Sequence, residues 1–300
     1  MSEGVMSEDV VRFGPDHTLV GILHSPPAET LPASLPGVVL LNAGILHRVG
    51  PNRLYVQIAR RLASRGFHVL RFDLAGIGDS GNAMSGGAPR THRDDVNDAM
   101  ACLLERGRTD RFLFMGICMG ARIALDVAAE DPRVDGAVLM EGIYIKSLRY
   151  HVSRVVRPEK WLRVLTGKSH NLKRVRAKVA SALPGPPGER SVPTAGSPDP
   201  IGSGEAHQDA KAMLGRMLSR GTKVLLVFRD GNEIAHNYSL RRAGTDIDAT
   251  GLPSGLEVSF IPFADHTFTP LVSQDLLIRR TITWIESSYL AAPAPVEAAR

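Results

Sequence analysis

The sequence predicts an α/β fold, in which a doubly wound and mostly parallel sheet carries helices on both faces. Short apolar runs alternate with amphipathic stretches along most of the chain, and this order is typical of parallel βαβ units. Some of the runs are apolar at every position, as Gly37-Val38-Val39-Leu40-Leu41 is. Such runs indicate strands that are buried on both faces of a sheet. Three hundred residues are enough for one large domain, or for one domain with an insertion.

The individual elements follow from these patterns. Residues 10–13 and 19–23 flank a Gly14-Pro15-Asp16 turn and predict an antiparallel hairpin at a sheet edge. Further strands are predicted at 37–41, at 67–72, in the apolar run that begins at 112, and at 134–140, 224–228 and 256–261. Helices are predicted at about 51–65, 91–106, 119–130 and 271–289. Ligands of such sheets bind beyond the carboxyl ends of the strands, so we expect the site there.

About eighty residues between the strands at 134–140 and 224–228 break the alternation, and we interpret them as an inserted cap. The predicted organisation is a core in two parts, 1–144 and 222–290, with a cap insertion at 145–221 and a tail at 291–300. Residues 146–178 contain eleven Lys or Arg and one acid, Glu159. Residues 183–206 are rich in Pro, Gly and Ser and predict a mobile segment.

The composition indicates which cellular compartment and which classes of partner to expect. Two cysteines, Cys102 and Cys118, form no disulfide framework and suit a reducing cytoplasm. The polar and acidic N-terminus has no signal-peptide pattern, and no apolar run approaches the roughly 20 residues of a membrane span. A formal net charge of +5 is modestly basic. Because no recognised nucleic-acid-binding module accompanies the charge, we do not expect nucleic acid as a partner.

The stretch around Cys118 carries the strongest chemical signal. The apolar run from 112 ends in Gly116-Ile117-Cys118-Met119-Gly120, which has the Gly-x-nucleophile-x-Gly spacing of a nucleophile elbow. Such a turn places its central residue in a strained backbone region, and the flanking glycines lack the Cβ atoms that would clash there. The helix that follows directs free N–H groups and its positive end at a thiolate. Outside this context the motif would indicate only a βα turn with a buried thiol.

The whole chain resembles an α/β-hydrolase, from the edge hairpin through the Asp73-x-x-Gly76-x-Gly78-x-Ser80 turn and the elbow to a late histidine. Within that superfamily it is similar to the hydrolases associated with the exosortase A system. Arg48-Val49-Gly50 with Arg53, Leu70-Arg71-Phe72-Asp73, Gly76-Ile77-Gly78-Asp79-Ser80 and Gly116-Ile117-Cys118 carry this resemblance. We expect Asp73, Gly76, Gly78 and Ser80 to be structural.

The resemblance implies a triad in the order nucleophile, acid and histidine. His266 follows the last strand, where the superfamily places its general base. The acid is expected after the strand at 224–228, where the usual spacing falls on Asn232. Glu233 and Asp230 are the candidates, with Glu233 preferred, and Glu141 after the preceding strand is a third. The oxyanion is expected on the backbone N–H groups of Met119 and of Gly44 or a neighbour in the 42–46 loop.

This chemistry predicts a cysteine-dependent acyl ester or thioester hydrolase that needs neither a metal nor a cofactor. An acyl-cysteine is a thioester, which amines and thiols attack more readily than an oxyester. An acyltransferase or cyclase that releases a carrier-bound acyl chain is therefore the second hypothesis. The displaced acid keeps open a third hypothesis, a non-catalytic binding protein on a hydrolase scaffold.

The basic residues of the insertion suggest a partner. An acyl carrier protein or the phosphates of coenzyme A would suit this charge, and we name Arg154 and Arg157 as representatives of a docking surface. A solvated helix face and an interfacial helix at an anionic membrane are the alternatives. His47 and Arg48 lie in the loop expected to border the site, and we expect them to contact substrate.

Overall fold

The computed structural model describes residues 5–27, 35–82, 84–85, 88–107, 109–142, 205–230 and 253–290. Within these ranges one sheet has the strand order β1-β2-β4-β3-β7-β8-β9-β10. The strands are β1 (Ser7–Phe13), β2 (Leu19–Ser25), β3 (Gly37–Leu41), β4 (Val69–Asp73), β7 (Phe112–Ile117), β8 (Val134–Met140), β9 (Lys223–Arg229) and β10 (Leu256–Ile261). β2 runs antiparallel to both β1 and β4, and the remaining neighbours are parallel. The predicted α/β-hydrolase fold class is confirmed.

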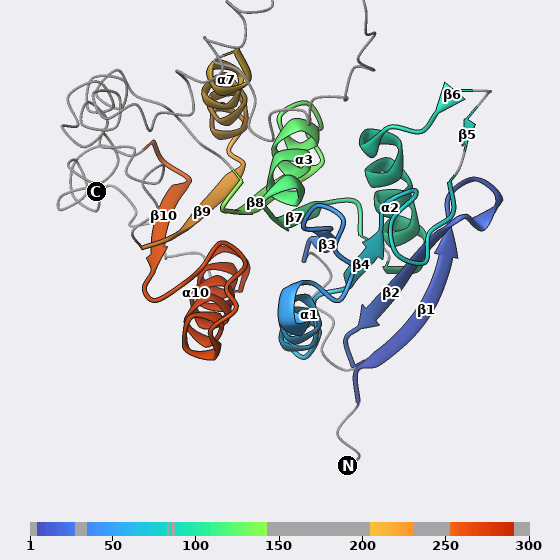
Figure 1. Cartoon of the computed structure of the whole chain (residues 1–300), viewed down its shortest axis with the longest axis horizontal. Coiled ribbons are helices and arrows are strands. Elements are labelled where there is room, and N and C mark those ends of the chain that lie inside the picture. Colours follow the sequence, from blue (N-terminus) through green and yellow to red (C-terminus); the bar gives the residue numbers. More distant parts are fainter. Residues whose placement is uncertain are drawn as a thin grey trace, which may run out of the picture.

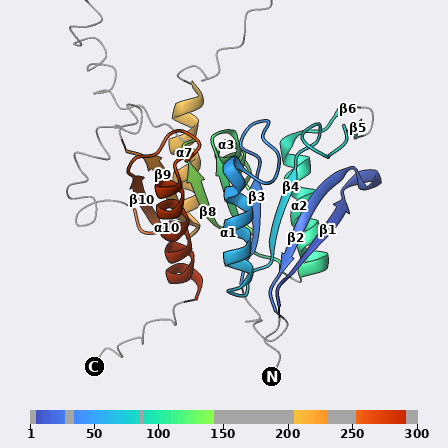
Figure 2. The same ribbon diagram turned by 60° about the horizontal axis from the view of Figure 1, so that its bottom comes forward.

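Helices cover both faces of the sheet (Figures 1 and 2). On one face lie α1 (Leu54–Ala63) and α10 (Leu271–Tyr289), and on the other lie α2 (His92–Gly107), α3 (Met119–Ala128) and α7 (Glu205–Ser219). Two short 3-10 turns, η1 (Pro15–His17) and η3 (Pro51–Arg53), and a small pair of strands, β5 (Met84–Ser85) and β6 (Ala88–Pro89), complete the described elements.

Two apolar cores follow from the alternation of side chains along the strands. On β3, Val39 and Leu41 belong to the core under α2, α3 and α7, whereas Val38 and Leu40 belong to the core under α1 and α10. All five residues of β3 are buried, as expected for a strand between two helix layers. This explains why apolar runs located the strands of this sheet from β2 onward to within two residues of their observed ends, whereas β1, which is buried at only two positions, begins three residues before the predicted 10–13.

The predicted insertion ends earlier than residue 221, because α7 packs in the core of the sheet. Helix α7 lies within the range 145–221, yet its Ala210, Leu214 and Met217 are buried in the core that β7, β8 and β9 share. The second part of the core therefore begins before residue 222. The basic stretch at 146–178 and the Pro/Gly/Ser-rich stretch at 183–206 lie outside the described residues, so both remain predictions. Among the described helices, none combines the length and apolar character needed to cross a bilayer.

The sheet brings together the segments that carry the predicted chemistry. The parallel strands β3, β7, β8 and β10 all end at the same edge of the sheet. The loop from Asn42 follows β3, Cys118 follows β7, Glu141 follows β8, and His266 lies in the segment after β10. Residues separated by more than two hundred positions thus meet beyond the carboxyl ends of the strands, as is usual for such sheets.

Candidate active site

Cys118 occupies a sharp turn between β7 and α3. Its backbone angles are φ 55° and ψ −112°, a conformation that costs an L-residue roughly 1–3 kcal/mol. The flanking glycines make the turn possible. A Cβ added to Gly116 would lie 2.3 Å from the carbonyl carbon of Gly120, and one added to Gly120 would lie 2.6 Å from the carbonyl oxygen of Leu41. The close approach predicted for both glycines is therefore confirmed.

The thiol of Cys118 is paired with the imidazole of His266. The hydrogen bond from His266 lowers the pKa of Cys118, with further lowering from the charge of His266 and the N–H of Met119, and burial opposes these effects. Hydrogen bonds to Cys118 and Glu141 raise the pKa of His266 to about 9, although burial lowers it. Both shifts favour the same pair of ions, a thiolate on Cys118 and an imidazolium on His266.

The carboxylate that contacts His266 belongs to Glu141. Its Oε2 lies 3.2 Å from Nδ1 of His266, and its Oε1 accepts a hydrogen bond of 2.6 Å from the backbone N–H of Arg229. Glu141 is fully buried at the end of β8 and has a positive φ of 51°. With Nδ1 held by the carboxylate, Nε2 of His266 is the nitrogen left for the thiol. Cys118, His266 and Glu141 thus form one chain of contacts.

This geometry revises the choice among the predicted acids. Asp230 is exposed just after β9, and the groups that raise the pKa of His266 are Cys118 and Glu141. Glu233, the preferred candidate, lies outside the described residues. The usual family spacing falls after β9, whereas the carboxylate that contacts His266 follows β8, the strand between β7 and β9. The sequence signal that could have favoured Glu141 is the Glu-Gly pair directly after an apolar strand. The glycine marks a close approach, because a Cβ on Gly142 would lie 2.3 Å from the carbonyl oxygen of Cys118.

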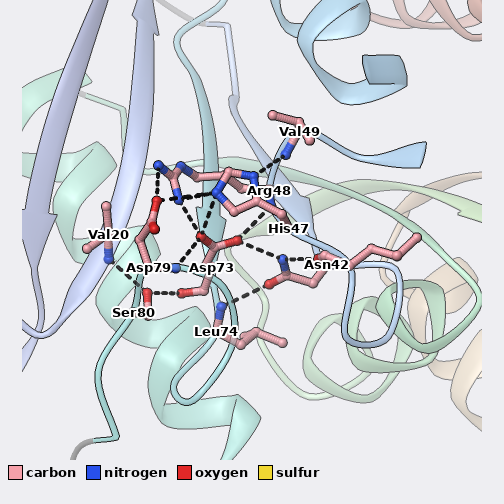
Figure 3. Close-up of polar contacts among 10 residues, drawn as sticks. Val20, Asn42, His47, Arg48, Val49, Asp73, Leu74, Asp79 and Ser80 are labelled. Atoms are coloured by element: carbon pink, nitrogen blue, oxygen red, sulfur yellow. Dashed lines mark hydrogen bonds and ion pairs between the residues drawn. The ribbon is translucent and has the colours of Figure 1, made fainter. Parts of the chain in front are cut away.

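Asp73 anchors the loop that follows β3 (Figure 3). Its buried carboxylate accepts hydrogen bonds from Nδ2 of Asn42 at 3.1 Å, from the backbone N–H of Arg48 at 2.6 Å, from the backbone N–H of Asp79 at 3.1 Å and from Nη1 of Arg48. Asn42 also donates to the carbonyl of Leu46 at 2.8 Å and accepts from the N–H of Leu74 at the same distance. One carboxylate and one amide therefore fix both ends of the 42–48 segment.

The guanidinium of Arg48 forms ion pairs within this network. Its guanidinium bonds Asp73 and also lies 2.7 Å from Oδ2 of Asp79, and its side chain is only 10% exposed. Its guanidinium faces the protein's own carboxylates (Figure 3), so these contacts show Arg48 as a support of the loop, and its contact with substrate stays a prediction. Ser80 donates to the carbonyl of Asp73 at 2.6 Å and accepts from the N–H of Val20 at 2.9 Å. The expected structural role of Asp73 and Ser80 agrees with these bonds.

His47 lies at the outer side of the same network. Its Nε2 is 3.3 Å from Asp79 and 3.4 Å from Asp73, and its side chain is 38% exposed. These three residues bring their ligand atoms within 4.8 Å of one another, as a cation site would require. However, Nη1 of Arg48 lies 2.7 Å from Nε2 of His47 and bonds Asp73, so a guanidinium already neutralises these carboxylates. We therefore assign no metal to this cluster.

The two predicted oxyanion donors belong to the residue after Cys118 and to the loop after β3. The N–H of Met119 bonds the thiol sulfur and so points at the reacting atom. Gly44 has a φ of 63°, and an added Cβ would meet no atom within 4 Å. The loop is therefore open to solvent beside this glycine. Arg154 and Arg157 lie outside the described residues, so carrier docking there remains a prediction.

Comparison with known proteins agrees with this architecture. The model of the family described as serine aminopeptidase, S33, matches residues 37–211. No curated protein matches the chain.

Among solved structures, the hypothetical protein PA2218 from Pseudomonas aeruginosa has a TM-score of 0.52 at 19% identity, over 95% of this chain and 94% of that one. XC6422 from Xanthomonas campestris, described as an α/β serine hydrolase without a lid, has a TM-score of 0.50 at 14% identity, over 98% and 99%. A thermophilic esterase from Thermogutta terrifontis has a TM-score of 0.50 at 15% identity, over 94% and 99%. At these identities the likeness concerns the fold. Because the family match spans more than half of the sequence, the chain belongs to the serine aminopeptidase, S33, family of α/β-hydrolases.

Proposed function

We propose that this protein is a cysteine-dependent acyl hydrolase, which cleaves esters or thioesters through a covalent thioester on Cys118. The observation that carries the proposal is the chain of contacts from Cys118 to His266 to Glu141, together with the lowered pKa of the thiol. A nucleophile within reach of a base that a third group orients is the signature of nucleophilic catalysis. The position of Cys118 beyond the carboxyl end of β7 supports the same conclusion.

In the acylation step, the thiolate of Cys118 attacks the acyl carbon and the carbonyl oxygen takes up the negative charge. The N–H of Met119 and a second N–H from the loop at Gly44 stabilise that oxyanion. The tetrahedral intermediate collapses by breaking the bond to the leaving group, which takes the proton of the His266 imidazolium. The acyl group is now bonded to sulfur, and His266 is neutral.

In the deacylation step, His266 acts as the base. Its raised pKa depends first on the hydrogen bond to Cys118 and second on Glu141. Acylation removes the charge of the thiolate, so the pKa of His266 falls and the imidazole is neutral when water arrives. His266 takes a proton from that water, the hydroxyl attacks the thioester, and the carbon–sulfur bond breaks. The products are the carboxylic acid and the original ion pair.

The proposal is tested by intact mass after incubation with p-nitrophenyl acyl esters and with acyl thioesters. We expect a transient mass increase equal to the acyl group, mapped to Cys118 by peptide digestion. Cys102 provides an internal control, because it is 97% buried and burial raises its pKa. A protein that neither turns over these donors nor forms the adduct would contradict the proposal and would favour the binding-protein hypothesis.

Transfer to an acceptor other than water is the second candidate function. The observation in its favour is that Cys118 stands at the elbow of a chain whose family is described as a serine aminopeptidase family. An acyl group on a cysteine is a thioester, which amines and thiols attack more readily than an oxyester. Incubation with a fixed acyl thioester and increasing amine, alcohol or thiol separates the two. Hydrolysis predicts free acid as the main product at every acceptor concentration, whereas a transferase would give mostly the transfer product.

The narrower resemblance to exosortase A system-associated hydrolases is also part of the proposal. The residues that carry it lie far apart in sequence, and several of them meet in one network: Arg48, Asp73, Asp79 and Ser80 (Figure 3). This clustering supports treating those motifs as one structural unit that supports the loop after β3.

A further inference from the structure

The hydroxyl of Tyr55 joins the ends of the two strands that flank the proposed reaction centre. Tyr55 lies on α1, and its Oη donates a hydrogen bond of 2.9 Å to the carbonyl oxygen of Leu41. Oη of Tyr55 also accepts a hydrogen bond of 3.0 Å from the backbone N–H of Ile117. Leu41 is the last residue of β3 and Ile117 is the last residue of β7. The next residues along the chain are Asn42, where the oxyanion loop begins, and Cys118.

This hydroxyl occupies a position in the hydrogen-bond ladder between the strands. β3 and β7 are parallel and pair Leu41 with Gly116. The N–H of Cys118 donates to Met140 of β8, so the N–H of the preceding residue, Ile117, faces β3. There it meets the Tyr55 hydroxyl, which in turn reaches the carbonyl of Leu41. A side chain of α1 thus bridges the two strand ends.

The ring of Tyr55 is fixed in position by burial and close packing. Its side chain is fully buried in the core under α1 and α10. A Cβ added to Gly50 would lie 2.6 Å from Cγ of Tyr55, and the backbone N–H of Tyr55 bonds the carbonyl of Val49 at 3.2 Å. Burial raises the pKa of the hydroxyl above its ordinary value, so it keeps the proton that it donates to Leu41.

We propose that Tyr55 is a positioning residue, whose hydroxyl fixes the placement of the oxyanion loop relative to Cys118. The inference rests on the proposed function. It adds a residue outside the triad, since Tyr55 acts through the two backbone groups that it bonds, the carbonyl of Leu41 and the N–H of Ile117. Misplacement of catalytic groups by about 1 Å can lower a rate about 100-fold. The loss should fall on acylation, which uses the oxyanion hole, and should spare alkylation of the thiolate, which does not.

The test is Tyr55→Phe, which removes one oxygen atom. Two rates are measured on the same preparation: alkylation of Cys118 by iodoacetamide, and acylation by a p-nitrophenyl ester under single-turnover conditions. We expect the acylation rate to fall about 10- to 100-fold while the alkylation rate stays within about twofold of the wild type. The matched control is Tyr289→Phe, since the hydroxyl of Tyr289 is also buried and lies beside Gly136 near the amino end of β8.

The outcomes separate the inference from the proposed function. A wild-type protein that is alkylated but never acylated contradicts the proposed function. A wild-type protein that is acylated, with Tyr55→Phe equally fast, overturns the positioning role alone. Equal losses of both rates would indicate a general disturbance and would also overturn it. If the variant melts below the assay temperature, both rates are measured in sucrose at a temperature where near-ultraviolet circular dichroism shows the native fold.

Discussion

The two sides of the candidate site are built on different physical principles. On the nucleophile side, Cys118, His266 and Glu141 form a chain of titratable groups, and both Cys118 and Glu141 have a positive φ. On the oxyanion-loop side, the contacts are a dense set of hydrogen bonds around the buried Asp73, and no strained residue lies between Asn42 and Arg48 apart from Gly44. The first side is built to exchange protons, whereas the second holds the loop in place through hydrogen bonds and ion pairs.

This difference assigns separate tasks to the two sides. A thiolate–imidazolium pair can give and take a proton during a reaction, which requires groups with shifted pKa values and some access to solvent. An oxyanion hole works best when its donors do not move as charge develops. Substitutions on the nucleophile side should therefore abolish the chemistry, and those on the loop side should reduce the rate and the stability together.

The largest effect is expected for Cys118→Ala. Removing the sulfur removes the covalent route, so kcat/KM for a p-nitrophenyl ester should fall by about 10⁴-fold or more. Cys102→Ala is the matched control, because Cys102 is a buried core residue of α2. It should keep full activity at a modestly lower melting temperature. Turnover that survives in Cys118→Ala would remove Cys118 as the nucleophile.

A smaller but large effect is expected for Glu141→Gln. The amide N–H₂ would face Nδ1 of His266 and favour the tautomer that carries its proton on Nε2, so the imidazole could not accept the thiol proton. We expect kcat to fall about 10²- to 10⁴-fold, measured with the same ester. The equivalent changes at the two alternative acids, Asp230→Asn and Glu233→Gln, should cost less than tenfold. A greater loss at either of those positions would reverse the assignment of the acid.

The loop side is tested by Asp73→Asn. An amide offers one acceptor oxygen where the carboxylate now accepts four hydrogen bonds, and it leaves Arg48 with Asp79 as its remaining partner. We expect the free energy of unfolding to fall by roughly 3 kcal/mol and kcat to fall about tenfold.

Asp275→Asn is the control for that loss of charge. Asp275 forms an exposed ion pair with Arg279 on α10, and such pairs contribute little to stability. Urea denaturation and ester hydrolysis supply the two measurements. An Asp73→Asn protein as stable and active as Asp275→Asn would show that the loop does not depend on this network.

Most of the fold could be predicted from sequence, because strands buried on both faces are continuous apolar runs that local patterns reveal. The elbow could be predicted for a related reason, since Gly116 and Gly120 mark a close backbone approach within five residues. From sequence Glu141 is only a third candidate, because its contact with His266 depends on which strands are neighbours in the sheet. The tasks of Tyr55 and Arg48 depend on contacts 62 and 25 residues away, and no local pattern encodes such partners.

The pairing of Cys118 with His266 is tested most directly by the pH dependence of Cys118 alkylation by iodoacetamide. An ordinary thiol has a pKa of about 8.5, so its alkylation rate falls about tenfold for each pH unit below that value. Because the hydrogen bond from His266 lowers the pKa of Cys118, the thiolate should persist to lower pH than an ordinary thiolate does, and the rate should stay near its maximum at pH values where that of an ordinary thiol has already fallen. Deprotonation of His266 near pH 9 should end turnover of acyl thioesters on the alkaline side.

His266→Ala should restore the ordinary profile, with Cys102 in the same protein as the unreactive reference. A wild-type profile that rises tenfold per pH unit to about pH 8.5, and that His266→Ala leaves unchanged, would contradict a thiolate–imidazolium pair at Cys118 and His266.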